Sequence, residues 1–193
     1  MAKKTGLFFG SFNPIHTGHL IIANFMATKT DLDEIWLVVS PHNPFKKKSS
    51  LAPERDRQHL VELAVEDNNL LRCSDIEFYL PQPSYTIDTL MYLREKFPGK
   101  LFSLIMGADN LRFIHKWKNA EILTRDYEIY LYNRPGYEIS ELVLQPEKLH
   151  IFDSPQIAVS STYIRECLKE GYSVRYLVPE PVFQYLNEHN IYS

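Results

Sequence analysis

The chain alternates short apolar runs with longer segments in which apolar positions recur at helical spacing. Residues 6–9, 35–40 and 101–106 are continuous or nearly continuous apolar runs. A run of this kind predicts a strand that is covered on both faces, as in a parallel sheet. Because the segments between these runs are typical of helices and loops, the pattern predicts an α/β fold built on a single open parallel sheet.

The remaining segments extend this pattern to residue 189. Strands are expected at residues 70–73, 127–132 and 150–152, with residues 76–80 continuing as extended chain, and helices at 20–27, 53–67, 87–97, 119–123, 160–170 and 179–189. The first strand, first helix and second strand form a βαβ unit, which is right-handed in nearly all proteins. The sequence contains no internal repeat or linker, so residues 1–193 are expected to form one domain.

The ten residues GSFNPIHTGH, starting at Gly10, join the first strand to the first helix, and we call them the signature turn. Gly10 permits a close approach that a side chain would block, Pro14 stiffens the turn, and Thr17 is expected to cap the helix. The helix start directs free N–H groups at the turn, which favours an anion such as phosphate. His16 and His19 add two donors there, although a single histidine in a first helical turn is usually structural.

Other candidate residues allow both a structural and a functional interpretation. Asp109 follows the apolar run at 101–106, where an acid can bind ribose hydroxyls or simply cap a helix. Trp117 is either a core residue or a stacking platform for a flat ring. The three lysines at 46–48 are either a solvated charge run or part of a loop that grips phosphate. Ser160 to Arg165 is either a capped helix start with a surface arginine or a second phosphate site.

Composition and charge narrow the function classes. Hydrophobic residues make up 45% of the chain, too many for a disordered protein, and the net charge of −3 gives no electrostatic case for nucleic acid. Cys73 and Cys167 form neither a disulfide framework nor a metal motif, which favours buried thiols in a reducing cytosol. No cleavable signal or apolar segment of about 20 residues is present, so we expect a soluble, cytoplasmic protein with no membrane partner.

Two motifs resemble those of a known superfamily. The signature turn resembles the GxFxPxHxGH motif of the nucleotidyltransferases related to class I aminoacyl-tRNA synthetases, and Val159–Arg165 resembles their ISSTxIR motif. The resemblance implies a Rossmann-like fold in which His16 and His19 contact the triphosphate and stabilise the departing phosphates. It also implies that the second motif grips the phosphates of ATP.

The stretch between the two motifs resembles the bacterial nicotinate-nucleotide adenylyltransferases, in the segments PSYT at 83–86, GAD at 107–109, Trp117 and NRPGY at 133–137, as does LVPEPV at 177–182. By this resemblance Asp109 holds a ribose, Trp117 stacks on a pyridine ring, and Tyr85 and Thr86 line the pocket for its carboxylate. The implied catalytic residues are His16, His19 and Arg165; the ATP-binding residues are Gly10, Ser11, Phe12, Lys46, Gly107, Asp109, Ser160, Ser161 and Thr162; and the substrate-binding residues are Ser84, Tyr85, Thr86, Trp117 and Arg134.

Three positions depart from the family pattern. Phe9 stands where the family often has a first glycine, which would tighten the ATP pocket, and Asn13 replaces a common aspartate, which removes a charge near the triphosphate. The frequent PPHK or PPHR appears here as NPFK, ending at Lys46, so Lys46, Lys47 and Lys48 all stay candidates for the phosphate contact.

The implied reaction joins ATP to nicotinate mononucleotide and gives nicotinate adenine dinucleotide and pyrophosphate. Mg²⁺ is expected to arrive with ATP, because the sequence shows no carboxylate cage for it and no other metal ligands. The alternatives are use of nicotinamide mononucleotide, alone or as well, and a nucleotide-binding sensor without turnover. Phosphopantetheine adenylyltransferase shares the first motif, but residues 83–86 and Trp117 argue against it. The oligomeric state stays open.

Overall fold

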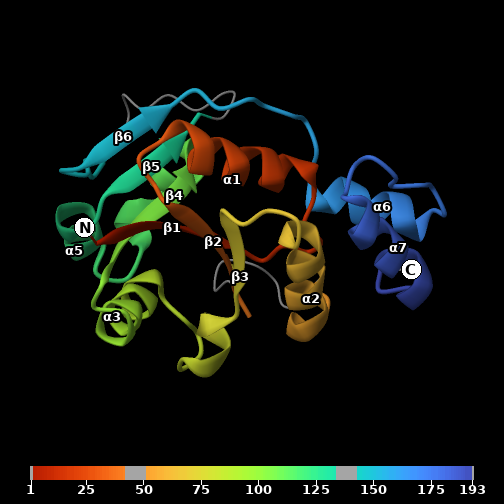
Figure 1. Cartoon of the computed structure of the whole chain (residues 1–193), viewed down its shortest axis with the longest axis horizontal. Helices are drawn as coiled ribbons and strands as arrows, with labels where there is room; N and C mark the ends of the chain where they lie inside the picture. Colours follow the sequence, from red (N-terminus) through yellow and green to blue (C-terminus); the bar gives the residue numbers. More distant parts are fainter. Residues whose placement is uncertain (1, 42–50, 134–142, 193) are drawn as a thin grey trace.

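A computed structural model describes residues 2–41, 51–133 and 143–192. Its centre is one six-stranded sheet with the order β3-β2-β1-β4-β5-β6, in which every neighbouring pair is parallel. This order reverses between β1 and β4, as in doubly wound sheets. The expectation of an open parallel α/β sheet is therefore confirmed (Figure 1).

The predicted helices and sheet strands occur in the expected order, with boundaries that differ by a few residues, and two short helices at 108–111 and 114–116 are additional. In chain order they are β1 (Lys3–Gly10), α1 (Thr17–Lys29), β2 (Glu34–Val39), α2 (Glu54–Val65), β3 (Leu71–Ser74), the 3₁₀ helix η2 (Ile76–Tyr79), α3 (Thr86–Lys96), β4 (Lys100–Gly107), α4 (Ala108–Leu111), the 3₁₀ helix η3 (Ile114–Lys116), α5 (Ala120–Asp126), β5 (Ile129–Tyr132), β6 (Leu149–Phe152), α6 (Ser161–Lys169) and α7 (Glu180–His189).

Two hydrophobic cores lie on opposite faces of the sheet. One contains Met26 of α1, Leu60 of α2 and Ile164 of α6, and the other contains Leu90 of α3 and Leu123 of α5. Figure 1 shows α1 above the strands and α3 below them, while α6 and α7 lie beyond α2. Because both faces are covered, the central strands are apolar at nearly every position, which explains their unbroken runs in the sequence.

One predicted element is wrong. Residues 76–80 were expected to be extended, but Ile76–Tyr79 forms the 3₁₀ helix η2. In this turn Phe78 N donates to Asp75 O at 2.9 Å, and the Gln82 side chain donates to Glu77 O at 2.9 Å. The turn places Ile76 in a core and also buries Glu77. In a strand, these two neighbouring side chains would point to opposite faces.

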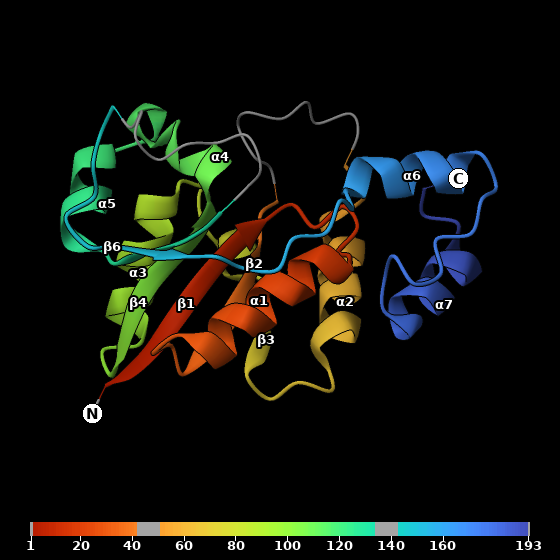
Figure 2. The same cartoon turned by 90° about the horizontal axis from the view of Figure 1, so that it is seen from above.

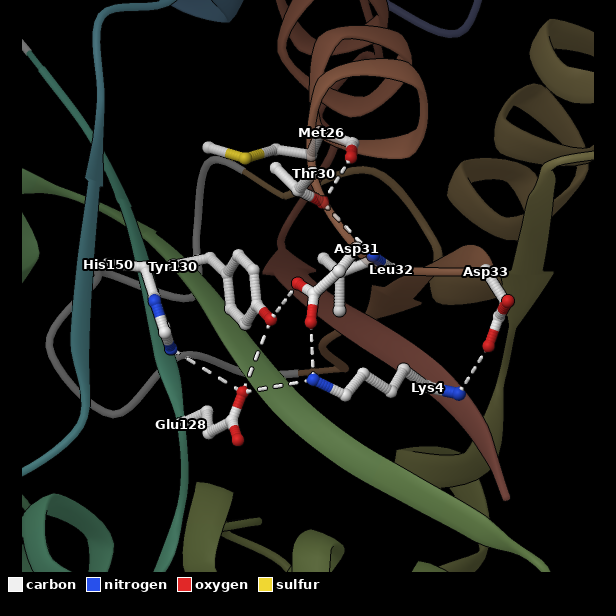
Figure 3. Close-up of polar contacts among 9 residues, drawn as sticks. All are labelled: Lys4, Met26, Thr30, Asp31, Leu32, Asp33, Glu128, Tyr130 and His150. Carbon is white, nitrogen blue, oxygen red and sulfur yellow. Dashed lines mark hydrogen bonds and ion pairs between the residues drawn. The ribbon is translucent and has the colours of Figure 1, made fainter. Parts of the chain in front are cut away.

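A cluster of polar side chains holds the amino ends of the strands (Figure 3). The Tyr130 hydroxyl donates to Asp31 Oδ1 at 2.5 Å and lies 3.2 Å from Glu128 Oε2, and Lys4 forms an ion pair with Asp31. His150 Nε2 lies 3.5 Å from Glu128 Oε2. These residues come from β1, from the segment after α1, and from the starts of β5 and β6. The cluster therefore ties these four segments together at the amino ends of the strands.

Glu34, at the start of β2, forms a second ion-pair cluster at the amino ends. Its carboxylate accepts from Lys3 Nζ at 2.8 Å and Thr5 Oγ1 at 2.9 Å, and it also pairs with Lys100. Burial raises the pKa of this carboxyl, but the hydrogen bonds from Lys100, Lys3 and Thr5 outweigh burial and lower the pKa to about 2.

We predict that Glu34→Gln destabilises the protein at pH 7 and that the difference from wild type shrinks in acid. The folded-state pKa lies below the ordinary value of 4.5, so the carboxylate stabilises the fold above about pH 4.5 and loses this effect as the pH falls toward 2. Denaturant unfolding between pH 2 and 7 measures the difference. The exposed Glu66→Gln is the control, and a Glu34→Gln difference that stays constant with pH contradicts the prediction.

Candidate active site

The carboxyl ends of β1 and β4 lie side by side where the strand order reverses. β1 ends at Gly10 and β4 at Gly107, and the two strands pair in register from Lys3 with Lys100 to Phe8 with Ile105. In open parallel sheets a ligand binds in the crevice formed at such a point. Figure 2 shows that β1 runs toward the start of α6, the helix that carries the second motif.

The signature turn is shaped by the packing of Phe12. A Cβ at Gly10 would lie 2.7 Å from the Phe12 ring, so only glycine fits beneath that ring. Phe12 itself has a φ of +42° and is 2% exposed, and its ring packs edge-on against His19 at 5.1 Å between centroids. The Phe12 side chain therefore positions the histidine, and only its backbone is left to contact a ligand.

His16 and His19 form a reciprocal unit at the start of α1. His16 is the N-cap, not Thr17 as expected from the sequence, and its backbone N–H donates to His19 Nδ1 at 3.2 Å. The two rings stack with centroids 3.7 Å apart. Because Nδ1 of His19 accepts a hydrogen bond, the proton of this ring belongs on Nε2, which is the donor nitrogen of the ring.

Thr17 has a different partner from the one expected. Its hydroxyl and its backbone N–H both donate to the carbonyl of Leu177, each at 3.0 Å. The segment before α7 therefore fixes the first residue of α1. This contact joins residues 160 positions apart and has no local pattern that would reveal it.

The second motif packs directly on the signature turn. Arg165 Nη1 donates to Asn13 O at 2.8 Å, and Ser161 Oγ donates to Pro14 O at 2.9 Å. Ser160 caps α6 by accepting from Tyr163 N at 3.2 Å, while Thr162 lies 3.3 Å from Arg165 Nη2. The two helix starts that were expected to bind phosphate are thus brought together.

Asn13 ties the signature turn to two further segments. Its side-chain oxygen accepts from Ala52 N at 3.0 Å and from the Tyr192 hydroxyl at 2.9 Å. The amide oxygen therefore serves as a structural acceptor for a segment before α2 and for one after α7. A neutral side chain can make both bonds, so the missing aspartate charge is not required to hold the turn.

Arg57 is a site residue that the sequence did not reveal. It is 1% exposed, and its guanidinium donates to four backbone carbonyls: Ser11 at 2.6 Å, Ser40 at 2.8 Å, Pro41 at 2.9 Å and Ala52 at 3.0 Å. It forms no ion pair within the described ranges 2–41, 51–133 and 143–192. A buried cation therefore fastens the signature turn to the end of β2, and burial lowers its pKa.

A cavity of about 130 Å³ opens beside the signature turn. Six of the residues predicted for the site line it, namely Gly10, Ser11, Ser84, Tyr85, Thr86 and Trp117. The same walls include Phe9, Ser40, Glu77, Asn110, Lys116, Lys118 and Leu123, which were not predicted as site residues. Phe9 faces this cavity, so the departure from glycine reduces the space inside it.

Gly107 and Asp109 lie at the end of β4, next to this crevice. Gly107 is the N-cap of α4, which rules out the interpretation of Asp109 as the N-cap. A Cβ at Gly107 would lie 2.4 Å from Asp109 Oδ1 and 3.0 Å from the Tyr132 ring, so glycine is required for this packing. Asp109 stands in the first turn of α4, with one carboxylate oxygen buried.

Two predicted site residues, Lys46 and Arg134, lie outside the described residues, as do Lys47 and Lys48. In the part of the chain that the structure does describe, no group of three or more His, Cys, Asp or Glu residues is arranged to hold a metal ion. No helix in that part is long and apolar enough to cross a membrane.

A doubly wound sheet, a signature turn in contact with the second motif, and a cavity lined by Gly10 and Ser11 of that turn are together typical of the nucleotidyltransferase class. The family model for cytidylyltransferase-like proteins matches residues 7–167. The chain is 51% identical over 194 aligned positions to a probable nicotinate-nucleotide adenylyltransferase of Christiangramia forsetii, with all of both chains covered. It is 50% identical over 190 residues to that of Flavobacterium johnsoniae, with 98% of both covered.

The fold is also that of solved structures. One is nicotinic acid mononucleotide adenylyltransferase of Plasmodium falciparum, complexed with NaAD, which matches with a TM-score of 0.82 at 18% identity. The match covers 98% of this chain and 97% of that chain. The protein belongs to the nicotinate-nucleotide adenylyltransferase family of cytidylyltransferase-like proteins.

We predict that Arg57→Met lowers the free energy of unfolding by about 3 kcal/mol or more, because several buried carbonyls lose a charged donor. Urea unfolding followed by circular dichroism measures the change. Arg55→Met on the same helix is the matched control, since the Arg55 side chain is 60% exposed and an ion pair at such a position, here with Asp75, contributes little to stability. Equal losses in the two variants contradict the role assigned to Arg57.

Proposed function

We propose that this protein transfers the adenylyl group of ATP to nicotinate mononucleotide, which gives nicotinate adenine dinucleotide and pyrophosphate. The observation that carries the proposal is the pair of hydrogen bonds from Arg165 and Ser161 to the signature turn, beside the cavity lined by Tyr85 and Trp117. The close relatives named as nicotinate-nucleotide adenylyltransferases support the same reaction. The reaction belongs to NAD biosynthesis.

The nucleophile in this reaction is the 5′-phosphate of the mononucleotide. Its second pKa is about 6, so it is mostly ionised at neutral pH and needs no general base. The protein's tasks are to align this phosphate with the α-phosphorus of ATP and to stabilise the leaving pyrophosphate. Both tasks require fixed donors, and a mobile acid or base is not needed.

The donors available for the pyrophosphate lie at the two helix starts. His19 offers Nε2–H, since its Nδ1 accepts from the backbone, and His16 stacks against it. Arg165 is held against the signature turn by its bond to Asn13 O and brings a positive charge to the same place. Gly10, Ser11, the backbone of Phe12, Ser160, Ser161, Thr162 and, from the loop, Lys46 complete the phosphate site in this proposal.

The two ends of the dinucleotide occupy different walls of the crevice. Gly107 and Asp109, at the end of β4, hold the adenosine ribose. Trp117 stacks on the pyridine ring, while Ser84, Tyr85 and Thr86 receive its carboxylate. Arg134, outside the described residues, is a further substrate-binding residue in this proposal. Lys118 Nζ stands 4.9 Å from the centre of the Tyr85 ring and adds a positive charge to this wall.

A divalent metal ion generally accompanies the nucleotide in reactions of this kind, and we propose Mg²⁺ for this role. The ion would arrive with ATP and keep several of its waters. We also propose that residues 1–193 act as one domain in the cytoplasm. The single continuous sheet supports one domain. The free cysteines Cys73 and Cys167 support the cytoplasm as the compartment.

We predict that His19→Ala lowers kcat by about 10²–10³ or more while the protein stays folded, because a well-aimed donor to the leaving group is lost. Pyrophosphate release from Mg-ATP and nicotinate mononucleotide measures the rate. His59→Ala, a half-exposed histidine on α2, is the control. A His19→Ala variant with more than half of the wild-type activity removes His19 from the mechanism.

We predict that Trp117→Ala raises KM for nicotinate mononucleotide at least tenfold and leaves KM for ATP within twofold. The reason is that the cavity loses its largest flat surface, which is worth about 1–3 kcal/mol per stacked ring. Steady-state kinetics with each substrate varied in turn measures both constants.

Dinucleotide formation with nicotinamide mononucleotide in the same assay tests the amide alternative, and ATP binding without pyrophosphate release identifies a sensor.

A further inference from the structure

The cavity contains a buried carboxyl group that the proposed reaction does not use. Glu77 is 3% exposed, lies on η2, and lines the cavity together with Tyr85 and Trp117. Acidic side chains are almost never fully buried without a partner, because the charged form is costly away from water. An acid in the wall of a pocket proposed for an anionic ring substituent therefore needs an explanation.

The polar surroundings of Glu77 are hydroxyl groups. Thr89 Oγ1, in the first turn of α3, donates to Glu77 Oε1 at 2.9 Å. The Ser40 and Ser84 hydroxyls are also near enough to favour the charged form, but burial outweighs all three and raises the pKa of the Glu77 carboxyl. No Lys or Arg forms an ion pair with Glu77 anywhere in the described part of the chain.

The other charged and titratable groups around the cavity are already engaged or stand on other walls. They are Lys118, paired with Asp88 at 2.8 Å; Lys116, which lines the cavity; Tyr85, beneath Lys118; and, on the element of Glu77 itself, Asp75 and Tyr79, which bond to each other at 3.1 Å. Ser40, directly after β2, and Thr89 of α3 present hydroxyl groups to Glu77.

Ser84 connects Glu77 to the expected position of the ligand. It is 8% exposed and lines the cavity, and among the described residues its Oγ has no hydrogen-bond partner of good geometry although it lies near Glu77. It directly precedes Tyr85 and Thr86, which the proposed function assigns to the ring carboxylate. A carboxylate bound there is close, through Ser84, to the Glu77 carboxyl.

We propose that Glu77 determines how this pocket discriminates between acid and amide mononucleotides, because the acid form binds together with one proton that Glu77 holds. This inference rests on the proposed function. Two carboxylates in one poorly solvated cavity do not both stay ionised, so the acid ligand requires the neutral form of Glu77. The amide ligand carries no such charge and has no such requirement. Solvent or buffer donates the proton to a Glu77 carboxylate oxygen, and no bond between heavy atoms forms or breaks.

The first test compares pH profiles of wild type and Glu77→Gln between pH 6 and 9. In wild type, the ratio of kcat/KM for nicotinate mononucleotide to that for nicotinamide mononucleotide falls with rising pH, by up to about tenfold per pH unit. Both ligands carry the same phosphate, so its titration cancels in the ratio. In Glu77→Gln, whose amide oxygen can still accept from Thr89, the ratio stays flat and exceeds the wild-type ratio at pH 9.

The control variant is Glu95→Gln, which removes an exposed carboxyl from α3 and leaves the cavity intact. It is expected to follow the wild-type profile. If wild type and Glu77→Gln give the same profile, the role of Glu77 is overturned while the proposed function stands. If neither mononucleotide yields a dinucleotide, the proposed function itself fails.

The second test needs no variant and therefore survives a folding defect in Glu77→Gln. Calorimetric titration of wild type with each mononucleotide, in two buffers of different ionisation enthalpy, counts the protons taken up on binding. For nicotinate mononucleotide the uptake rises toward about one proton as the pH approaches 9. For nicotinamide mononucleotide no such rise is expected. Equal proton uptake for the two ligands across this range overturns the inference.

Discussion

The site depends on one constraint, which is that the start of α6 is hydrogen-bonded to the backbone of the signature turn. Arg165 and Ser161 donate to the carbonyls of Asn13 and Pro14, about 150 residues earlier in the chain. These bonds set the distance between two helix starts, each of which directs N–H groups and a partial positive charge outward. Neither motif could position the phosphates of a nucleotide with the same accuracy alone.

The amino and carboxyl ends of the strands are stabilised in different ways. The amino ends contribute to stability, whereas the candidate site lies at the carboxyl ends. At the amino ends, Lys4, Asp31, Tyr130 and Glu128 form ion pairs and hydrogen bonds that satisfy one another (Figure 3). At the carboxyl ends, Arg57 is a buried cation and Glu77 a buried acid, and neither has an oppositely charged partner in the described residues. The uncompensated groups are thus found where an anionic ligand is proposed to bind.

Much of the fold could be predicted from the sequence because its signals are local. Strands covered on both faces appear as unbroken apolar runs, and the signature turn and the second motif have recognisable patterns at the expected positions. The missed features depend on distant partners. Arg57 lies on a predicted helix among other charged residues, and only the fold shows that it reaches Ser11 and Ser40. Thr17 likewise bonds to Leu177 and does not cap its own helix.

The bond from the His16 backbone to His19 Nδ1 has a further consequence for how this site can change. The His19 ring is hydrogen-bonded to the backbone N–H of His16, the N-cap of α1, so the ring and the helix move as one body. A shift of the helix toward the ligand would carry the side-chain donor with it by the same amount. Because α6 is hydrogen-bonded to the same turn, a shift of α1 would also be transmitted to Arg165 and Ser161, and the donors at the two helix starts would move together.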